Sequence, residues 1–126
     1  MFKILIIDDD STTLQLLDFL LTRHKYKVTL SPGGEDGIKK AQKIIPDLII
    51  LDVMMPQIDG IAVCKKLRKI EDTAEIPILF LSALGRDTDV MDGLMAGGDG
   101  YIVKPFDTDH LLTAIENLIK KKKAHS

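Results

Sequence analysis

The sequence lacks the features that define several classes of protein. Its single cysteine, Cys64, cannot form a disulfide framework, which favours a reduced, intracellular setting. No apolar run approaches the roughly 18 residues of a membrane span. Residues 1–3 lead directly into a short strand pattern rather than into a signal peptide. These absences predict a cytoplasmic protein that does not enter a membrane.

Neither sign of charge dominates. Lys and Arg number 17 and Asp and Glu number 19, which gives a net charge of −2. This balance offers no electrostatic footprint for nucleic acid, so no direct contact with DNA or RNA is expected. The local exception is the run Lys120–Lys123. We interpret it as the solvated end of a last helix, where cations complement the helix dipole; the alternative is a tail that docks a partner.

Five short apolar runs alternate with five amphipathic segments. The runs are typical of strands covered on both faces, and they comprise residues 4–7, 27–30, 48–51, 77–81 and 101–103. Each segment between them repeats apolar residues on one helical face. These sets are Leu14, Leu17 and Leu21; Ile38, Ala41 and Ile45; Val63, Leu67 and Ile70; Val90 and Leu94; and Leu111, Ile115 and Leu118. A chain of 126 residues fits one domain, expected at 1–123 with a short tail at 124–126.

Capping residues and glycines mark the helix boundaries. The expected N-terminal caps are Ser11, Asp59, Asp87 and either Asp107 or Thr108. Gly97 and Gly98 follow the fourth helix, where a glycine can take the left-handed conformation. Gly33, Gly34 and Gly37 do not fit a dinucleotide-binding fingerprint, and we interpret them as a turn and helix entry.

The alternation of strands and helices predicts an α/β fold with a parallel sheet and helices on both faces. Five strands are too few for a closed barrel. The flavodoxin-like order 2-1-3-4-5 would place the first strand beside the third, and therefore Asp8 and Asp9 beside Asp52. Periodicity alone does not determine this order, but the acidic residues favour it.

Reactive side chains follow four of the five strands. Asp8, Asp9 and Asp10 follow the first, and Asp52 follows the third; the fourth and fifth are followed by Ser82 and Lys104. The carboxyl ends of parallel strands share one edge, so these groups should converge. Carboxylates packed so closely need raised proton affinity or a cation between them. The set describes a site for a divalent cation, with Mg²⁺ the natural candidate, and for a phosphoryl group.

The motifs around these residues resemble the receiver domain of bacterial two-component response regulators, of the chemotaxis-regulator-like type. They are IIDDD at 6–10, LDVMMP at 51–56 with DG at 59–60, LSA at 81–83 and YIVKPF at 101–106. The resemblance runs from about residue 3 to residue 120 and includes every motif in order. It implies a flavodoxin-like fold and a signalling module in a phosphorelay rather than a turnover enzyme.

The resemblance also implies roles for the acidic residues. Asp52 is the implied phosphoacceptor, which attacks the phosphorus of a phosphohistidine on a sensor histidine kinase or a histidine phosphotransfer protein. Asp9 is the implied direct ligand of Mg²⁺, with Mn²⁺ as the alternative ion, and Asp8 binds it through water or tunes the site. Asp52 itself and the backbone carbonyl of Met54 complete the expected metal ligands. Asp10 is expected to be a bystander that faces solvent or helps the helix cap.

The remaining roles concern the response to phosphorylation. Ser82 is expected to donate a hydrogen bond to a phosphoryl oxygen and Lys104 to form an ion pair with another. Tyr101 is the implied switch residue, which would rotate as Ser82 shifts and reshape the face of the fourth helix, fifth strand and fifth helix for a downstream protein. A monomer or a weak, phosphorylation-linked dimer is expected. Met54 and Leu84 are apolar where some receivers carry polar groups that orient water, so we expect slow self-dephosphorylation.

Two alternative functions remain open from the sequence. A magnesium-dependent phosphohydrolase of the haloacid-dehalogenase kind also forms an aspartyl phosphate, but it needs a second Asp where Met54 stands. A scaffold that is never phosphorylated would not need Asp9, Asp52 and Lys104 together. The chain is expected to be either a stand-alone receiver or a piece of a longer regulator.

Overall fold

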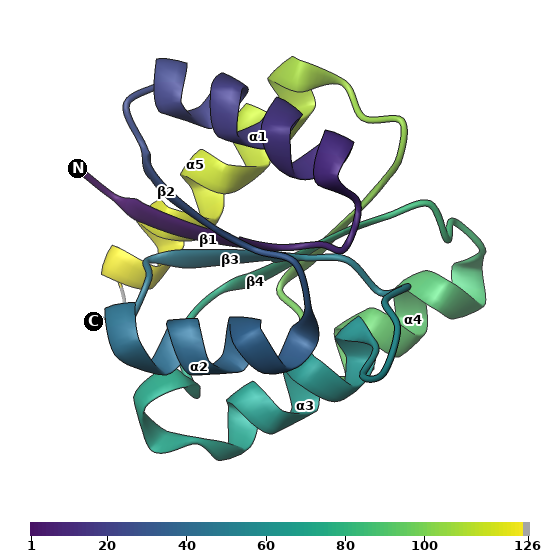
Figure 1. Cartoon of the computed structure of the whole chain (residues 1–126). Helices are drawn as coiled ribbons and strands as arrows, with labels where there is room; N and C mark the ends of the chain where they lie inside the picture. The colour runs from purple at the N-terminus through teal and green to yellow at the C-terminus, as the bar shows by residue number, and fades with distance from the viewer. Residues whose placement is uncertain (125–126) are drawn as a thin grey trace.

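In a computed structural model that describes residues 1–124, the chain forms a five-stranded parallel sheet with helices on both faces (Figure 1). The strands are β1 (Lys3–Ile7), β2 (Lys27–Ser31), β3 (Leu48–Leu51), β4 (Ile78–Ser82) and β5 (Gly100–Val103). The helices are α1 (Ser11–Arg23), α2 (Gly34–Ile44), α3 (Gly60–Lys69), α4 (Asp87–Met95) and α5 (Thr108–Ala124), with a short 3₁₀ turn, η1 (Glu71–Thr73). None of the helices in this part of the chain is long and apolar enough to cross a membrane.

The sheet order is β2-β1-β3-β4-β5, which confirms the flavodoxin-like prediction. The register aligns Ile7, the last residue of β1, with Leu51, the last residue of β3. The residues that follow, Asp8 and Asp52, therefore leave the sheet at neighbouring points of one edge. The topology alone thus places two carboxylates side by side.

Two apolar cores cover the two faces of the sheet. In Figure 1, α1 and α5 lie on one face, and α2, α3 and α4 lie on the other. The first core joins alternate residues of the central strands to α1 and α5, and the second joins the intervening residues to α2 and α3. Because the strands are covered on both sides, the residues of β1, β3 and β4 are almost all fully buried. The sheet is therefore a rigid platform for the groups at its edge.

Two helix starts differ from the sequence prediction. Asp10, rather than Ser11, caps α1, because its carboxylate accepts a hydrogen bond from the N–H of Thr12 at 3.3 Å. Arg86, rather than Asp87, precedes the first residue of α4, and its backbone N–H donates to Asp89 Oδ2 at 3.1 Å. In each case the sequence prediction is off by one position, because the backbone conformation decides which residue precedes the first turn of the helix.

The other predicted helix boundaries are confirmed. Asp59 caps α3. At the start of α5, Asp107 accepts a hydrogen bond from the N–H of His110 at 3.3 Å. Gly33 stands at the cap of α2, and Gly97 follows α4 with a positive φ of 114°. The lysine run lies in the last turns of α5, which extends to Ala124; residues 125 and 126 of the predicted tail lie outside the described residues.

The predicted apolar helix faces are correct in part. Ile45 and Ile70 follow α2 and α3 as their C-caps, and Ile45 is 42% exposed. In α5 the third buried residue is Ile119, while Leu118 is half-buried. Leu94 of α4 is 44% exposed. The predicted face of α4 is therefore wrong, which distinguishes this helix from the others.

Candidate functional site

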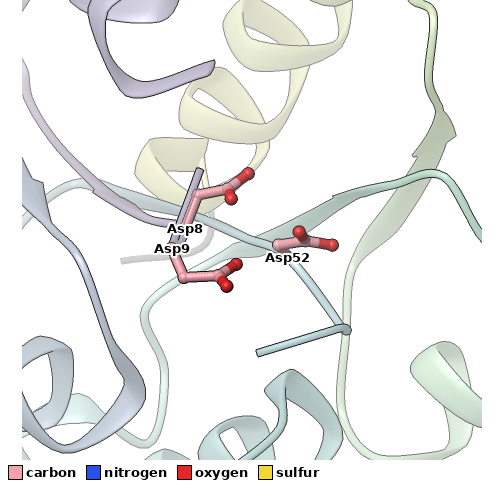
Figure 2. A group of neighbouring side chains, drawn as sticks. All are labelled: Asp8, Asp9 and Asp52. Carbon is pink, nitrogen blue, oxygen red and sulfur yellow. The ribbon is translucent and has the colours of Figure 1, made fainter. Parts of the chain in front are cut away.

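Three carboxylates converge at the carboxyl end of the sheet. Figure 2 shows Asp8 and Asp9 after β1 and Asp52 after β3, with their carboxylates directed into the same space. One oxygen from each lies within 4.8 Å of the others. Asp8 and Asp52 are buried, whereas Asp9 is exposed. The sequence prediction that these residues meet is therefore confirmed.

Lys104, after β5, supplies a positive charge to this cluster. Its Nζ donates to Asp8 Oδ2 at 2.8 Å and lies 3.6 Å from Asp52 Oδ2. The other oxygen of Asp8 accepts from the N–H of Asp10 at 2.9 Å, and Asp52 Oδ1 accepts from the N–H of Met54 at 3.4 Å. The polar contacts of the Asp52 carboxylate are thus longer than those of Asp8.

Burial and repulsion make Asp52 an unusual carboxylate. Burial raises its pKa above the ordinary value, and the nearby charge of Asp8 raises it further. Lys104, the hydroxyl of Ser82 and the N–H of Met54 act in the opposite direction but do not cancel the rise. Burial alone would lower the pKa of Lys104, yet its hydrogen bond to Asp8 and the charge of Asp52 outweigh burial and raise it. The ammonium is therefore held charged beside the carboxylates.

The donor set fits a hard divalent cation. Three carboxylates that share one space offer the oxygen ligands that Mg²⁺ prefers, and their mutual repulsion is what such an ion relieves. Asp9, the exposed member, lines an open pocket of about 490 Å³ together with Met54 and Leu84. The cluster could therefore hold a metal ion that is reached from solvent.

Ser82 and Tyr101 are joined through the loop that follows β4. Ser82 is the last residue of β4 and fully buried, and its Oγ accepts from the N–H of Leu84 at 3.2 Å. The hydroxyl of Tyr101 donates to the carbonyl of Leu84 at 2.6 Å. The Tyr101 ring also lies against Phe80, with the ring centroids 5.8 Å apart. Sequence reasoning identified Ser82 and Tyr101 but missed the backbone group that connects them, because a carbonyl carries no residue-specific signal.

The Asp-Gly pair after β3 is explained by a close approach. A Cβ at Gly60 would lie 2.0 Å from the backbone oxygen of Asp52. The N–H of Gly60 donates to the carbonyl of Val53 at 2.8 Å. Asp59 accepts from the N–H of Ala62 at 2.9 Å and so begins α3. Only glycine permits α3 to start in direct contact with the backbone of Asp52.

Comparison with known proteins identifies the family of this chain. The family model for the response regulator receiver domain matches residues 4–116. The chain belongs to this family. It is 41% identical over 119 residues to the DNA-binding dual master transcriptional regulator RpaA of Synechocystis, covering 94% of this chain and 49% of that protein. It is 40% identical to the alkaline phosphatase synthesis transcriptional regulatory protein PhoP of Bacillus subtilis, with 94% and 49% covered.

Solved receiver structures give the same result. A putative response regulator from Chloroflexus aurantiacus superposes with a TM-score of 0.90 at 34% identity, and the chemotaxis protein CheY4 of Vibrio cholerae with 0.89 at 31%; each match covers 94% of this chain and 98% of the other. The chain spans about half the length of the curated relatives it matches. A receiver domain is a signalling module and not a turnover enzyme, so the phosphohydrolase alternative is set aside.

Proposed function

We propose that this receiver domain accepts a phosphoryl group on Asp52 from a phosphohistidine of a sensor histidine kinase or a histidine phosphotransfer protein. An Oδ of Asp52 attacks phosphorus, the phosphorus–nitrogen bond breaks, and the imidazole leaves. The observation that carries this proposal is that Asp52 adjoins two further carboxylates and the ammonium of Lys104 at the end of a buried strand. Phosphoryl transfer needs positioning and charge more than covalent chemistry from the protein, and this arrangement supplies both.

Asp8, Asp9 and Asp52, with the backbone carbonyl of Met54, would hold the Mg²⁺ ion, for which Mn²⁺ could substitute. When bound, the ion neutralises charge on the phosphoryl oxygens. Asp9 is the proposed direct ligand because it is the exposed member of the cluster. Asp8, already bonded to Lys104, would act through water.

Ser82 and Lys104 would bind the phosphoryl oxygens. Lys104 Nζ, 3.6 Å from Asp52 Oδ2, needs only a short side-chain movement to reach an oxygen of a group attached there. The Ser82 hydroxyl already interacts with the Asp52 carboxyl and offsets part of the rise in its pKa. Its Oγ accepts from the N–H of Leu84, so its O–H can donate a charge-assisted hydrogen bond to a phosphoryl oxygen.

The response would pass through Tyr101. If Ser82 turns toward a phosphoryl group, the loop that carries the Leu84 carbonyl moves, and the hydroxyl of Tyr101 is bonded to that carbonyl. The adjoining elements bear exposed apolar side chains, among them Met91 and Leu94 of α4 and Val103 of β5. We infer that a downstream protein binds this α4–β5–α5 face, or that it forms a weak dimer contact after phosphorylation.

A groove beside Lys104 is a candidate docking site for the donor protein. The groove measures about 380 Å³ and runs between α1 and the segment after β5. Its apolar lining includes Phe19, which is 63% exposed, and Phe106. A cytoplasmic donor protein docked here would lie next to the phosphoacceptor, and the domain itself would then contact proteins rather than nucleic acid.

Intact mass spectrometry after incubation with acetyl phosphate and Mg²⁺ tests the proposed phosphoacceptor. We expect the mass of one phosphoryl group to be gained by the parent and by Asp72→Asn, which changes an exposed carboxylate in η1, but not by Asp52→Asn. No gain in the parent would favour the unphosphorylated scaffold. Hydrolysis of an added phosphate ester over many cycles would instead indicate an enzyme.

The docking groove is tested with a phosphorylated histidine phosphotransfer protein as donor. Phe19→Ala should slow transfer from this protein by about tenfold, the effect of losing about 1.4 kcal/mol of contact. Phosphorylation by acetyl phosphate, which needs no docking, should be unchanged. Equal slowing with both donors would show that Phe19 acts on the site rather than on docking.

A further inference from the structure

Arg68, on α3, holds together three segments that lie at the opposite end of the sheet from the carboxylates. Its Nε and Nη2 donate to the carbonyl of Gly97 at 3.0 and 2.8 Å, and its Nη1 donates to the carbonyl of Ile76 at 2.8 Å. Nη1 also reaches the carbonyls of Thr73 and Ala74 at 3.4 and 3.2 Å. The side chain is 21% exposed. Nothing in the proposed phosphorylation chemistry uses this guanidinium.

The same guanidinium reaches the start of β5. Its Nη2 forms an ion pair of 2.9 Å with Asp99 Oδ2. Asp99 Oδ2 also accepts from the N–H of Ile78, and the N–H of Asp99 donates to the carbonyl of Ile78. Asp99, the residue before β5, is therefore bound to Ile78, the first residue of β4. It lies two positions before Tyr101 in the chain. Arg68 is the cation that pairs with this partly exposed carboxylate.

The carboxyl end of α4 is the end that is anchored. The carbonyl of Ala96 accepts from Cys64 Sγ at 3.4 Å, and that of Gly97 accepts from Arg68. A Cβ at Gly97 would lie 2.9 Å from the Arg68 side chain, so the approach is close. Of the nine described residues of α4 itself, only Gly93 is buried. At its amino end, α4 continues from the loop whose Leu84 carbonyl accepts from Tyr101.

We propose that Arg68 is a positioning residue for Tyr101. Arg68 fixes the end of α4 and the start of β5. When the loop after Ser82 moves, α4 therefore turns about its fixed end and displaces Tyr101, and the helix does not shift as a whole. A lysine cannot replace it, because one ammonium does not match the fork of donors that reaches Gly97 and Asp99 together. The response to phosphorylation in this inference rests on the proposed function; the resting position of Tyr101 does not.

The test uses Tyr101 as a single reporter. The chain has two tyrosines, so a Tyr26→Phe background labelled with 3-fluorotyrosine gives one ¹⁹F resonance. Spectra are recorded with and without beryllofluoride and Mg²⁺. In Arg68→Lys we expect the resting resonance to shift or broaden and its response to beryllofluoride to fall by about twofold or more. Phosphorylation of Asp52 by acetyl phosphate should stay within about twofold of the parent.

Two further variants separate positioning from loss of stability. Arg86→Lys changes an exposed arginine at the start of α4. The Tyr101 resonance of this variant should match that of the parent both with and without beryllofluoride. Asp99→Asn removes the ion pair but keeps the backbone bonds, so it should shift Tyr101 in the same sense by less, and it serves if Arg68→Lys does not fold.

A Tyr101 resonance unchanged in both Arg68→Lys and Asp99→Asn would overturn the inference, even if both variants melt at lower temperature. If the parent takes up no phosphoryl group, it is the proposed function that fails. The resting spectra still decide the role of Arg68 in that case.

Discussion

Two neighbouring helices on the same face of the sheet, α3 and α4, are held in different ways (Figure 1). α3 buries Gly60, Val63, Cys64 and Leu67. α4 buries only Gly93 among its described residues and leaves Met91 and Met95 more than half exposed. Buried apolar surface stabilises packing by about 25 cal/mol per Å², so α3 is bound along its length and α4 mainly at one end.

This difference matches the strands that the two helices follow. Asp52 directly follows β3, and the firmly packed α3 keeps that carboxylate beside Asp8. β4 ends at Ser82, and the thinly packed α4 follows a loop whose movement needs little loss of buried surface. A receiver needs a fixed acceptor and a movable sensor of its phosphoryl group. Under the proposed function, unequal packing on one face of the sheet would meet both requirements.

The largest predicted effect compares one leucine from each helix. Leu67→Ala in α3 should lower the free energy of unfolding by about 2–5 kcal/mol, because it leaves a cavity in a closed core. Leu94→Ala in α4 removes a side chain that is 44% exposed and should change stability by about 0.5 kcal/mol or less. Urea denaturation measures both. Similar losses of stability in the two variants would mean that α4 is packed as firmly as α3.

A smaller effect is expected from adding one methyl group to each helix. Gly60→Ala places a Cβ 2.0 Å from the Asp52 backbone oxygen, which cannot move freely, and should cost about 1–3 kcal/mol. In Gly93→Ala the atoms nearest to the added Cβ belong to the side chains of Phe80 and Tyr101, at 3.0–3.1 Å. The gain of about 1 kcal/mol in helix propensity should roughly offset that crowding.

The readouts of these glycine variants also differ in kind. Gly60→Ala should reduce phosphorylation of Asp52 by acetyl phosphate, because the shift begins at that residue. Gly93→Ala should leave phosphorylation intact and alter the environment of Tyr101. Thermal unfolding and intact mass spectrometry together distinguish them; a fully active Gly60→Ala protein would contradict the fixed role of the β3–α3 junction.

Much of the fold follows from the sequence because its strands are covered on both faces. Continuous apolar runs predicted all five strands to within one residue at each end. The strand order did not follow from periodicity; it depended on the need to bring Asp8 and Asp9 beside Asp52. The predicted α4 face failed because Val90 and Leu94 repeat like a core face, while the glycines at 93, 97 and 98 determine how the helix approaches the sheet.

The site was predictable to the extent that side chains define it. Asp8, Asp9, Asp52 and Lys104 meet because parallel strands end at one edge. The partners of Arg68 and Tyr101 are mostly backbone carbonyls in loops, which any residue provides, so no sequence pattern marks them. This is why the acidic cluster was found from sequence and the connections behind it were not.

The last prediction compares the loops that lead into the two helices. Met54, before α3, and Leu84, before α4, line the same open pocket beside Asp9, and neither offers a polar group to orient water. The double variant Met54→Asn, Leu84→Glu should lose the phosphoryl group faster than the parent, on the order of tenfold, which corresponds to about 1.4 kcal/mol of activation free energy.

The single variants sharpen this comparison. Met54→Asn should account for most of the acceleration, because the loop into α3 is held beside Asp52 and would keep a bound water in one place. Leu84→Glu should contribute less, because its loop moves with α4.

Met91→Asn, on the exposed side of α4, is the matched control and should lose the phosphoryl group at the same rate as the parent. Decay is followed by intact mass after removal of acetyl phosphate. Equal rates for the parent and the double variant would exclude any role of these two side chains in phosphoryl lifetime, and a larger effect at Leu84 would show that the loop before α4 is the better ordered of the two.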